Sequence, residues 1–389
     1  MNIKRFFQFF FLFMTCLAGK GLAAIPYPSS IWSSDRLHGT LIGVKWGHVL
    51  AVDENNIVTL SDHHLIIYRL EENQLTQELD YQEKNSDNWI KLSLFDVDGN
   101  GTDEIIVTAL GNRGVHSQVF QIVDSKLKKL TTTSLYLGVI SWEDKKIIVA
   151  QKKLGGDDFS GPFIQMEWDG KKLISKGKTH LPGGLSGESM SLYSVNGTHL
   201  GKKEGFLYLH PEGTLYYYEE VGNGKYRKVW SSGESYGGAV DYLNIPIKNP
   251  LNEVVRKSFL VPVSFETYQP SVTTVTDPNN TNEPSNNFPL GESPIETYLV
   301  KNSGYLKEVT GAVPSIKNAQ FVRLVWTGYG FQENWNSPRL DGAITDFQLV
   351  DWDNDGKPEI LASLLLRDQG YIDTLKKQDS ILIVIKVPE

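Results

Sequence analysis

The chain has 389 residues, and its 46 acidic and 38 basic side chains give a formal net charge of −8. No basic block stands out, which argues against a nucleic-acid partner. Aromatic residues make up 11% of the chain and there are 35 glycines, a composition that favours short aromatic strands separated by glycine turns. Helical periodicity of useful length is missing after the first 24 residues, so the sequence predicts an all-β protein.

The N-terminal segment has the pattern of a secretory signal peptide. Two basic residues precede an apolar run at 6–17, and small residues follow up to Ala23 and Ala24. The run is about half as long as a bilayer span requires, so we predict a signal peptide at 1–24 and a mature chain starting near Ile25. An uncleaved anchor is the alternative.

Export has a consequence for how the fold is stabilised. Cys16, the only cysteine, lies inside the predicted signal peptide, so the mature chain has no disulfide. Its stability must come from its core, to which a bound metal could add. No later stretch is apolar enough to cross a membrane. We therefore expect a periplasmic, outer-membrane-associated or extracellular protein.

Two short repeats mark pairs of strands. Residues 165–181 (QMEWDGKKLISKGKTHL) and 323–340 (RLVWTGYGFQENWNSPRL) both place Trp-x-Gly in a turn between two strands. A second pattern starts with Trp, has Ser at its third place and ends on Gly at its eighth; it occurs at 32–39, 230–237 and 335–342. Such recurrence indicates a repeat architecture.

A third repeat is an apolar strand, an acidic turn and another apolar strand. It is clear at 92–110 and 347–365, with degenerate copies at 49–61, 138–151 and 191–209. Joined to the other two repeats, it gives a unit of four short strands in about 40–50 residues, which is typical of a propeller blade. The sequence thus predicts a single β-propeller over residues 25–389.

The number of blades follows from the number of units. Acidic turns, their remnants or an equivalent insertion indicate six units, near residues 53, 96, 143, 194, 266–294 and 351. The segment 235–247 could belong to a weak extra unit, and seven blades fit the average unit length better. We predict six or seven four-stranded blades and favour seven.

The polar segment at 270–294 is rich in Pro, Asn, Ser and Thr. It cannot bury enough apolar surface to order itself, so we predict a disordered insertion between two strands. A binding loop is the alternative.

Two acidic turns have the spacing of a metal site. Oxygen-bearing side chains alternate at positions 1, 3, 5 and 9 around a glycine at position 6, and position 7 offers a backbone carbonyl. The predicted ligands are Asp96, Asp98, Asn100, Thr102 and Glu104 in the first turn, and Asp351, Asp353, Asp355, Lys357 and Glu359 in the second. An all-oxygen, largely anionic set suits Ca²⁺.

Acidic surface turns are the alternative, since Asp, Asn and Gly are common turn residues. Two turns in the same repeat register favour the metal. The degenerate copies have lost the ligands: Ser194, Val195 and Asn196 replace most of the acidic pattern in one of them, and we predict no metal there.

These turns, D-x-D-G-N-G-x-x-E and D-x-D-N-D-G-x-x-E, resemble the FG-GAP/VCBS repeats of integrin-α-like propellers. The wider unit, with its Trp-x-Gly turn and its Trp-x-Ser strand end, resembles bacterial exported VCBS-repeat proteins. The resemblance implies a propeller fold, Ca²⁺ bound for rigidity, and a binding or adhesive role, but it implies no particular ligand.

Catalytic motifs give little support to an enzyme. Residues 233–237 (GESYG) match a nucleophile-elbow pattern with Ser235 as nucleophile, yet no helical pattern follows. We therefore expect a non-enzymatic binding or scaffold module for a protein or glycan partner. The alternative is a polysaccharide hydrolase or lyase, which would place carboxylates with shifted pKa values in the central channel.

The order of the repeats also predicts how the ring closes. The last unit ends one strand short, after 380–387, while a Trp-x-Ser pattern stands alone at 32–39. We predict that residues around 29–35 form the outer strand of the last blade, with Trp32 placed like Trp230 and Trp335. An open ring would leave two unpaired edges.

Overall fold

The computed structural model describes residues 29–61, 63–83, 88–111, 114–142, 145–152, 161–178, 190–200, 203–210, 213–237, 243–248, 254–259, 265–268, 295–305, 315–366 and 379–388. The predicted signal peptide at 1–24 and the predicted insertion at 270–294 lie outside these residues. No helix within the described ranges is long and apolar enough to span a membrane.

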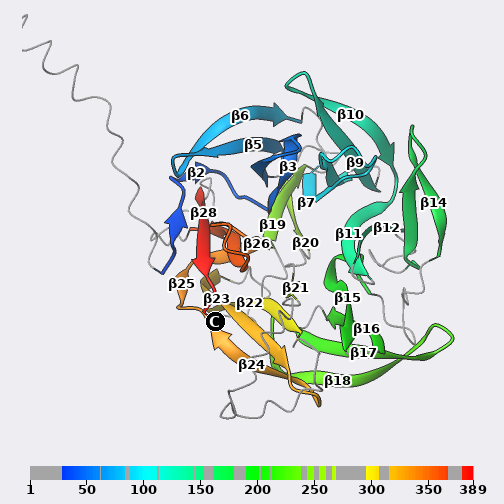
Figure 1. The fold of residues 1–389 in the computed structure, drawn as a ribbon. Coiled ribbons are helices and arrows are strands. Elements are labelled where there is room, and N and C mark those ends of the chain that lie inside the picture. Colours follow the sequence, from blue (N-terminus) through cyan, green and yellow to red (C-terminus); the bar gives the residue numbers. More distant parts are fainter. Residues whose placement is uncertain are drawn as a thin grey trace, which may run out of the picture.

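The chain folds as an all-β propeller. Six antiparallel four-stranded sheets, here called blades 1 to 6, surround a common axis, and Figure 1 shows the ring that they form. Each blade starts with a strand near the axis and ends with one at the rim. Apart from a single 3-10 turn at Leu192–Ser194, every regular element in the described ranges is a strand.

Blades 1 to 3 follow one another along the chain. Blade 1 consists of β3 (Gly43–Ala51), β4 (Glu54–Leu60), β5 (His64–Glu71) and β6 (Gln74–Gln82). Blade 2 consists of β7 (Asn88–Phe95), β8 (Glu104–Gly111), β9 (Gly114–Val123) and β10 (Lys126–Thr133). Blade 3 consists of β11 (Tyr136–Trp142), β12 (Lys145–Gln151), β13 (Ile164–Trp168) and β14 (Leu173–Lys178).

Blades 4 to 6 complete the ring. Blade 4 consists of β15 (Val195–Leu200), β16 (Lys203–Leu209), β17 (Thr214–Gly222) and β18 (Lys225–Ser235). Blade 5 consists of β21 (Glu266–Tyr268), β22 (Glu296–Tyr305), β23 (Ser315–Trp326) and β24 (Phe331–Asn336), with β25 (Leu340–Asp341) on β23. Blade 6 consists of β26 (Ala343–Val350), β27 (Glu359–Leu365), β28 (Asp379–Lys386) and β1 (Trp32–Ser33), with β2 (Leu37–His38) also on β28.

The expectation of six or seven blades is therefore confirmed at six, and the preference for seven is corrected. The segment 235–247, which suggested an extra blade, ends in β19 (Leu243–Lys248), and β19 pairs with β20 (Val254–Phe259) alone. Pro246 in β19 has no N–H with which to bond a further strand, which fits a two-stranded hairpin better than the middle of a blade.

The apolar runs of the second strands follow from the stacking of blades. A blade packs against a neighbour on each face, so both faces of its inner strands are buried. In β8, Ile105 and Val107 pack in the cluster shared with blade 1, while Ile106 between them packs in the cluster shared with blade 3. In β27 all seven residues are buried. A near-continuous apolar strand is the expected result, as in other sheets that are covered on both faces.

The Trp-x-Ser pattern has the same structural role in each copy. The serine Oγ accepts a hydrogen bond from a backbone N–H of the third strand of its blade: Leu382 to Ser34 (2.9 Å), Leu215 to Ser232 (3.0 Å) and Phe321 to Ser337 (2.9 Å). The closing glycines Gly39, Gly237 and Gly342 all have positive φ (102°, 70° and 134°), a conformation that favours glycine.

Closure by an N-terminal strand is confirmed. Trp32 pairs with Val384 and Ser33 with Ile383, so β1 forms the outer strand of blade 6. Its tryptophan is 6% exposed, and Trp230 and Trp335 lie on the corresponding outer strands β18 and β24. The ring thus has no open blade at the junction of the two chain ends.

The connection that contains the predicted insertion starts and ends at paired residues. β21 and β22 pair from Glu266 with Tyr298 to Tyr268 with Glu296. Tyr268 and Glu296, which flank the segment on either side, are therefore direct neighbours across a ladder.

Replacing residues 270–294 with a short Asn-Gly turn should leave the fold intact, because the flanking strands already hold both ends together. We expect a melting temperature and a far-UV circular dichroism spectrum close to those of the full chain. Insoluble or unfolded protein would show that the segment is structural.

Candidate metal centres

Two acidic loops occupy equivalent places in blades 2 and 6. Loop I (residues 96–104) leads from β7 into β8, and loop II (residues 351–359) leads from β26 into β27. Both loops turn through positive φ at their fourth and sixth positions: Gly99 (76°) and Gly101 (89°) in loop I, Asn354 (59°) and Gly356 (82°) in loop II. Glycine and asparagine are the residues that adopt this conformation most readily, so the sequence fixes the turn.

The same hydrogen bonds shape both loops. The carboxylate at position 1 accepts from the N–H at position 6, position 3 accepts from 5, position 5 from 7, and position 9 from 2. In loop I these bonds join Asp96 to Gly101 (2.9 Å), Asp98 to Asn100 (3.2 Å), Asn100 to Thr102 (2.7 Å) and Glu104 to Val97 (2.7 Å). In loop II they join Asp351 to Gly356 (3.1 Å), Asp353 to Asp355 (3.3 Å), Asp355 to Lys357 (2.8 Å) and Glu359 to Trp352 (3.0 Å).

Each loop brings three carboxylates together. One oxygen from each of Asp96, Asp98 and Glu104 lies within 4.8 Å of the others, and the same holds for Asp351, Asp353 and Glu359. The fourth carboxylate predicted for loop II, Asp355, does not belong to this group. Its Oδ1 accepts from Lys357, and its Oδ2 lies 3.6 Å from the Lys386 ammonium. The predicted ligands at position 7, Thr102 and Lys357, lie at matching points of the two turns.

The ninth-position glutamates are buried beneath the loops. Glu104 and Glu359 are 0% and 1% exposed. Burial, followed by the charges of Asp98 and Asp96, raises the pKa of Glu104 to about 7, and its hydrogen bonds from Val97 and Gln121 only partly oppose this. Burial, with Asp353 and Asp355 adding to it, also raises the pKa of Glu359. Both loops therefore concentrate negative charge that a cation would relieve.

The strand next to each loop presents a different side chain to it. In blade 2, the Gln121 amide on β9 donates to Glu104 (3.0 Å) and to Asp98 (3.3 Å). In blade 6, the residue paired with Glu359 is Lys386 on β28, and its ammonium lies 3.2 Å from Asp353 Oδ2. Loop II thus already holds one positive charge from the protein, whereas loop I is faced by a neutral amide.

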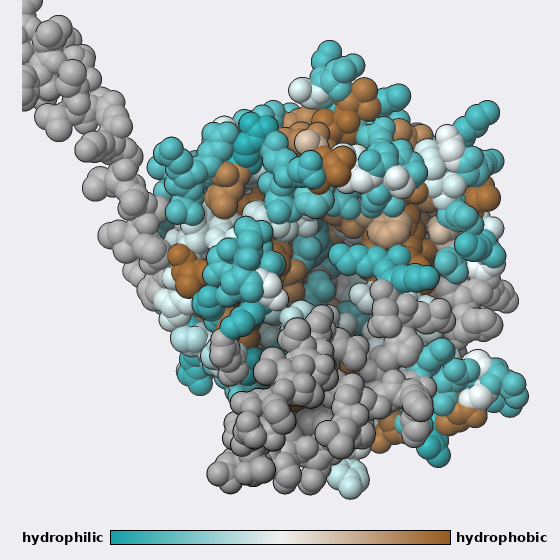
Figure 2. Space-filling view, in the orientation of Figure 1, coloured by the Kyte–Doolittle hydropathy of each residue, from teal (hydrophilic) through white to brown (hydrophobic). Residues whose placement is uncertain are grey.

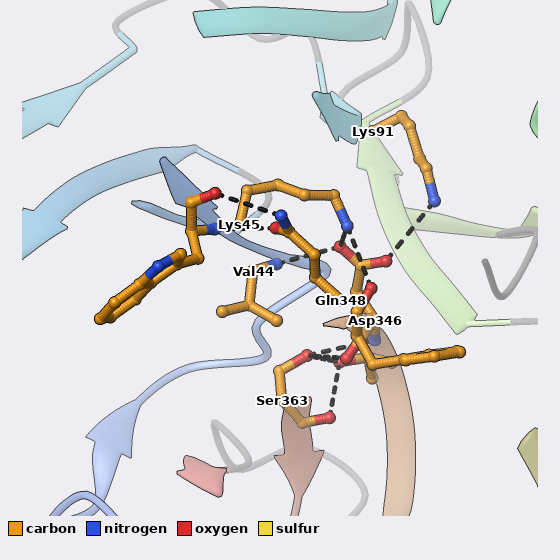
Figure 3. Close-up of polar contacts among 9 residues, drawn as sticks. Val44, Lys45, Lys91, Asp346, Gln348 and Ser363 are labelled. Carbon is orange, nitrogen blue, oxygen red and sulfur yellow. Dashed lines mark hydrogen bonds and ion pairs between the residues drawn. The ribbon is translucent and has the colours of Figure 1, made fainter. Parts of the chain in front are cut away.

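A second polar cluster, here called the axis cluster, was missed by sequence reasoning; its side chains meet between blades (Figure 3), on inner strands near the centre of the ring in Figure 1. Asp346 on β26 is 0% exposed, and it accepts hydrogen bonds from the Lys45 ammonium (2.6 Å) and the Val44 backbone (3.1 Å) of β3. Lys91 on β7 lies 3.7 Å from the other carboxylate oxygen. Gln348 binds the Trp46 backbone twice, accepting from its N–H (2.8 Å) and donating to its carbonyl (3.2 Å).

Burial shifts the proton equilibria of the axis cluster. It lowers the pKa of Lys91 even though Asp346 acts in the opposite direction. It raises the pKa of Glu266, which comes from β21 in blade 5, against the influence of Lys45 and other lysines. The signal in the sequence was a single charged residue in an otherwise uncharged inner strand, as in ITDFQLV and NWIKLSL.

Ser235, the candidate nucleophile, lies at the end of β18 and is exposed. The next described element, β19, is a strand and not the helix that a nucleophile elbow requires. The Ser235 segment is the outer-strand repeat of blade 4. In this repeat, Ser232 accepts the hydrogen bond from the third strand that is found in the other two copies of the Trp-x-Ser pattern.

A scan against protein-family models finds none that matches this chain, and a search of curated proteins finds no matching relative.

Without a bound cation, the buried Glu104 should make the unfolding free energy fall as pH rises. The folded state holds this proton more tightly than the unfolded state, so its contribution is present below about pH 4.5 and is lost as pH rises through about 7. Such a shift corresponds to roughly 3 kcal/mol. Glu104→Gln should flatten this part of a denaturant-unfolding pH profile measured in chelator. Glu167→Gln, an exposed control, should not; equal profiles for all three proteins would contradict the argument.

Proposed function

We propose that the protein is a non-enzymatic propeller, stabilised by Ca²⁺, that acts as a binding or scaffold module for a protein or glycan partner. The observation that carries the proposal is the recurrence of one acidic turn, with the same hydrogen bonds and the same three converging carboxylates, in blades 2 and 6. A single acidic turn is a common surface feature, and its recurrence with converging carboxylates in two blades supports a shared ligand.

The donor set supports Ca²⁺ in preference to a transition metal. Asp96, Asp98 and Glu104 would supply carboxylate oxygens in loop I, and Asn100 and the Thr102 carbonyl are further oxygen donors. In loop II, Asp351, Asp353 and Glu359 take the corresponding places, with Asp355 and the Lys357 carbonyl as further donors. Hard oxygen ligands of this kind suit Ca²⁺, whereas zinc and copper prefer histidine and cysteine.

The cation would act on stability and not on chemistry. Each loop joins the first strand of a blade to the second, and its buried glutamate begins the second strand. A cation held there ties the two strand ends together and neutralises charges that otherwise repel. Binding to the folded state alone adds about 2.7 kcal/mol when the free cation exceeds its Kd a hundredfold.

The contacts of the axis cluster are explained by a structural role and do not require catalysis. A polysaccharide hydrolase or lyase, the alternative function, needs carboxylates that reach a substrate. Asp346 is fully buried, and its oxygens are directed to Val44 and Lys45 of blade 1 and Lys91 of blade 2. Its contacts join blades 6, 1 and 2, which supports a structural role for the cluster.

We place the protein among exported FG-GAP/VCBS-repeat propellers of the cell envelope or surface. The six-blade ring supports the fold part of this assignment. The apolar run at 6–17 with its small-residue end supports export, and the acidic turns support the repeat family. Bacterial origin and the identity of the partner rest on the resemblance alone.

Chelation should lower the melting temperature of the native protein, and added Ca²⁺ should restore it. The double variant Asp98→Ala/Asp353→Ala should lose this response, because each loop lacks a carboxylate of its converging set. Asp169→Ala is the matched control: its carboxylate accepts backbone hydrogen bonds in a turn of blade 3 but belongs to neither loop. A melting temperature that does not respond to chelator would overturn the assignment.

Lys386 should weaken cation binding at loop II. Its half-exposed ammonium competes for Asp353, so Lys386→Gln should raise the affinity of loop II by about twofold to fivefold, the range for exposed ion pairs. The reciprocal change, Gln121→Lys, should weaken loop I. Calorimetric titration with loop I silenced by Asp98→Ala, or loop II by Asp353→Ala, isolates each site. An unchanged loop II affinity in Lys386→Gln would contradict this role.

A further inference from the structure

The N-terminal strap, defined here as residues 29–41, holds the rim of the ring closed. The Ile31 and Ser34 N–H groups donate to Val384 and Leu382 of β28 (2.9 Å each), and Leu382 donates back to Ser34 Oγ (2.9 Å). Only the two-residue strands β1 and β2 of the strap pair with β28. Because this ladder is short, contacts of the strap side chains must contribute much of its attachment.

Trp32 of the strap reaches across the seam, the boundary between blades 6 and 1. Its indole N–H donates to the Asn73 carbonyl (2.8 Å), in the turn between β5 and β6. Its ring lies 5.0 Å from the ring of Trp352, and Trp352 in turn lies 5.1 Å from Trp46 on β3. Trp352 therefore stands between the strap and the innermost strand of blade 1.

Trp352 is also the second residue of loop II. Its backbone N–H donates to Glu359 (3.0 Å), whose partner across the ladder is Lys386 of β28, the strand that binds the strap. At the same position loop I has Val97, which packs against the apolar cluster between blades 2 and 3. These contacts between tryptophan side chains thus connect loop II, and not loop I, to the strap.

We propose that the strap and loop II open and close together as one unit, coupled by Trp352. Aromatic pairs at these separations contribute to stability beyond the area they bury. When the strap leaves, Trp352 loses one of its two ring partners, and the loop that begins with it loosens. When loop II loosens, Trp32 loses the surface on which it packs.

This coupling has a consequence for the cation that rests on the proposed function. Linkage is reciprocal, so a cation bound at loop II would tighten the strap by the same factor by which a closed strap raises affinity at loop II. Filling loop I would leave the strap unchanged. Loop II would then act as the site through which cation level regulates closure of the ring.

Native-state amide exchange of the full chain in chelator tests the coupling without any cation. Trp352→Val installs the residue that loop I has naturally. It should speed exchange at Ile31 and Ser34 by about tenfold, the factor that corresponds to about 1.4 kcal/mol. Trp335→Val is the control, because it makes the same truncation on the outer strand of blade 5; it should leave the strap amides unchanged.

The reverse variant, Trp32→Val, should speed exchange at Trp352 and Gly356 in loop II but not at Val97 and Gly101 in loop I. Unchanged strap exchange in Trp352→Val, or equal effects on both loops in Trp32→Val, would overturn the proposal. If Trp352→Val does not fold, Trp352→Phe should give a smaller effect of the same sign, and its absence would count against coupling.

Repeating the exchange measurement with Ca²⁺ separates this inference from the proposed function. Protection that rises at both loops, and at the strap only while loop II is intact, supports both. If Ca²⁺ changes neither loop, the calcium assignment fails, while the coupling is still decided by the measurements in chelator. If Ca²⁺ protects loop II but not the strap, the regulatory coupling is wrong.

Discussion

Closure between the first and last blades is the constraint on which this ring depends, because an unclosed seam would leave two blades without a neighbour. The seam is closed by two sets of contacts, one near the propeller axis and one at the rim. At the axis, Asp346 accepts from Val44 and Lys45, and Gln348 binds the Trp46 backbone twice. At the rim, the strap completes blade 6. In Figure 2, polar residues cover much of the coloured part of this face, with smaller apolar patches among them. The buried apolar clusters lie between blades, including the one between blades 6 and 1.

The axis contacts also explain why charge is tolerated inside. A buried ion pair contributes little net stability, because desolvation offsets much of its attraction. Its geometry is selective, however: Asp346 reaches the Val44 N–H and the Lys45 ammonium together in the relative position that β26 and β3 adopt. We therefore interpret the axis cluster as a determinant of how blade 6 packs on blade 1, more than as a source of stability.

The sequence predicted most where a local pattern repeats. The Trp-x-Ser motif alone located the closing strand, because its serine and glycine carry out a local task that is the same in every copy. The acidic turns were placed for the same reason. The number of blades was harder to predict from the sequence. The turns near residues 143 and 194 have lost their acidic pattern, and the segment 235–247 resembles part of a further blade. The partners of the Asp346 carboxylate could not be inferred, since they lie on blades 1 and 2; Val44, for example, is 302 residues away along the chain.

The pairing of both chain ends in one blade has a consequence for folding. Ser34 and Leu382 are hydrogen-bonded although they lie 348 residues apart in the sequence. Contacts of such separation form late, because the entropy of a long loop must be overcome before they give any return. A growing chain can thus assemble its early blades but cannot finish the ring until its last strand exists. Any product cut short before β28 would keep two exposed edges, a form prone to aggregation and easily recognised by proteases.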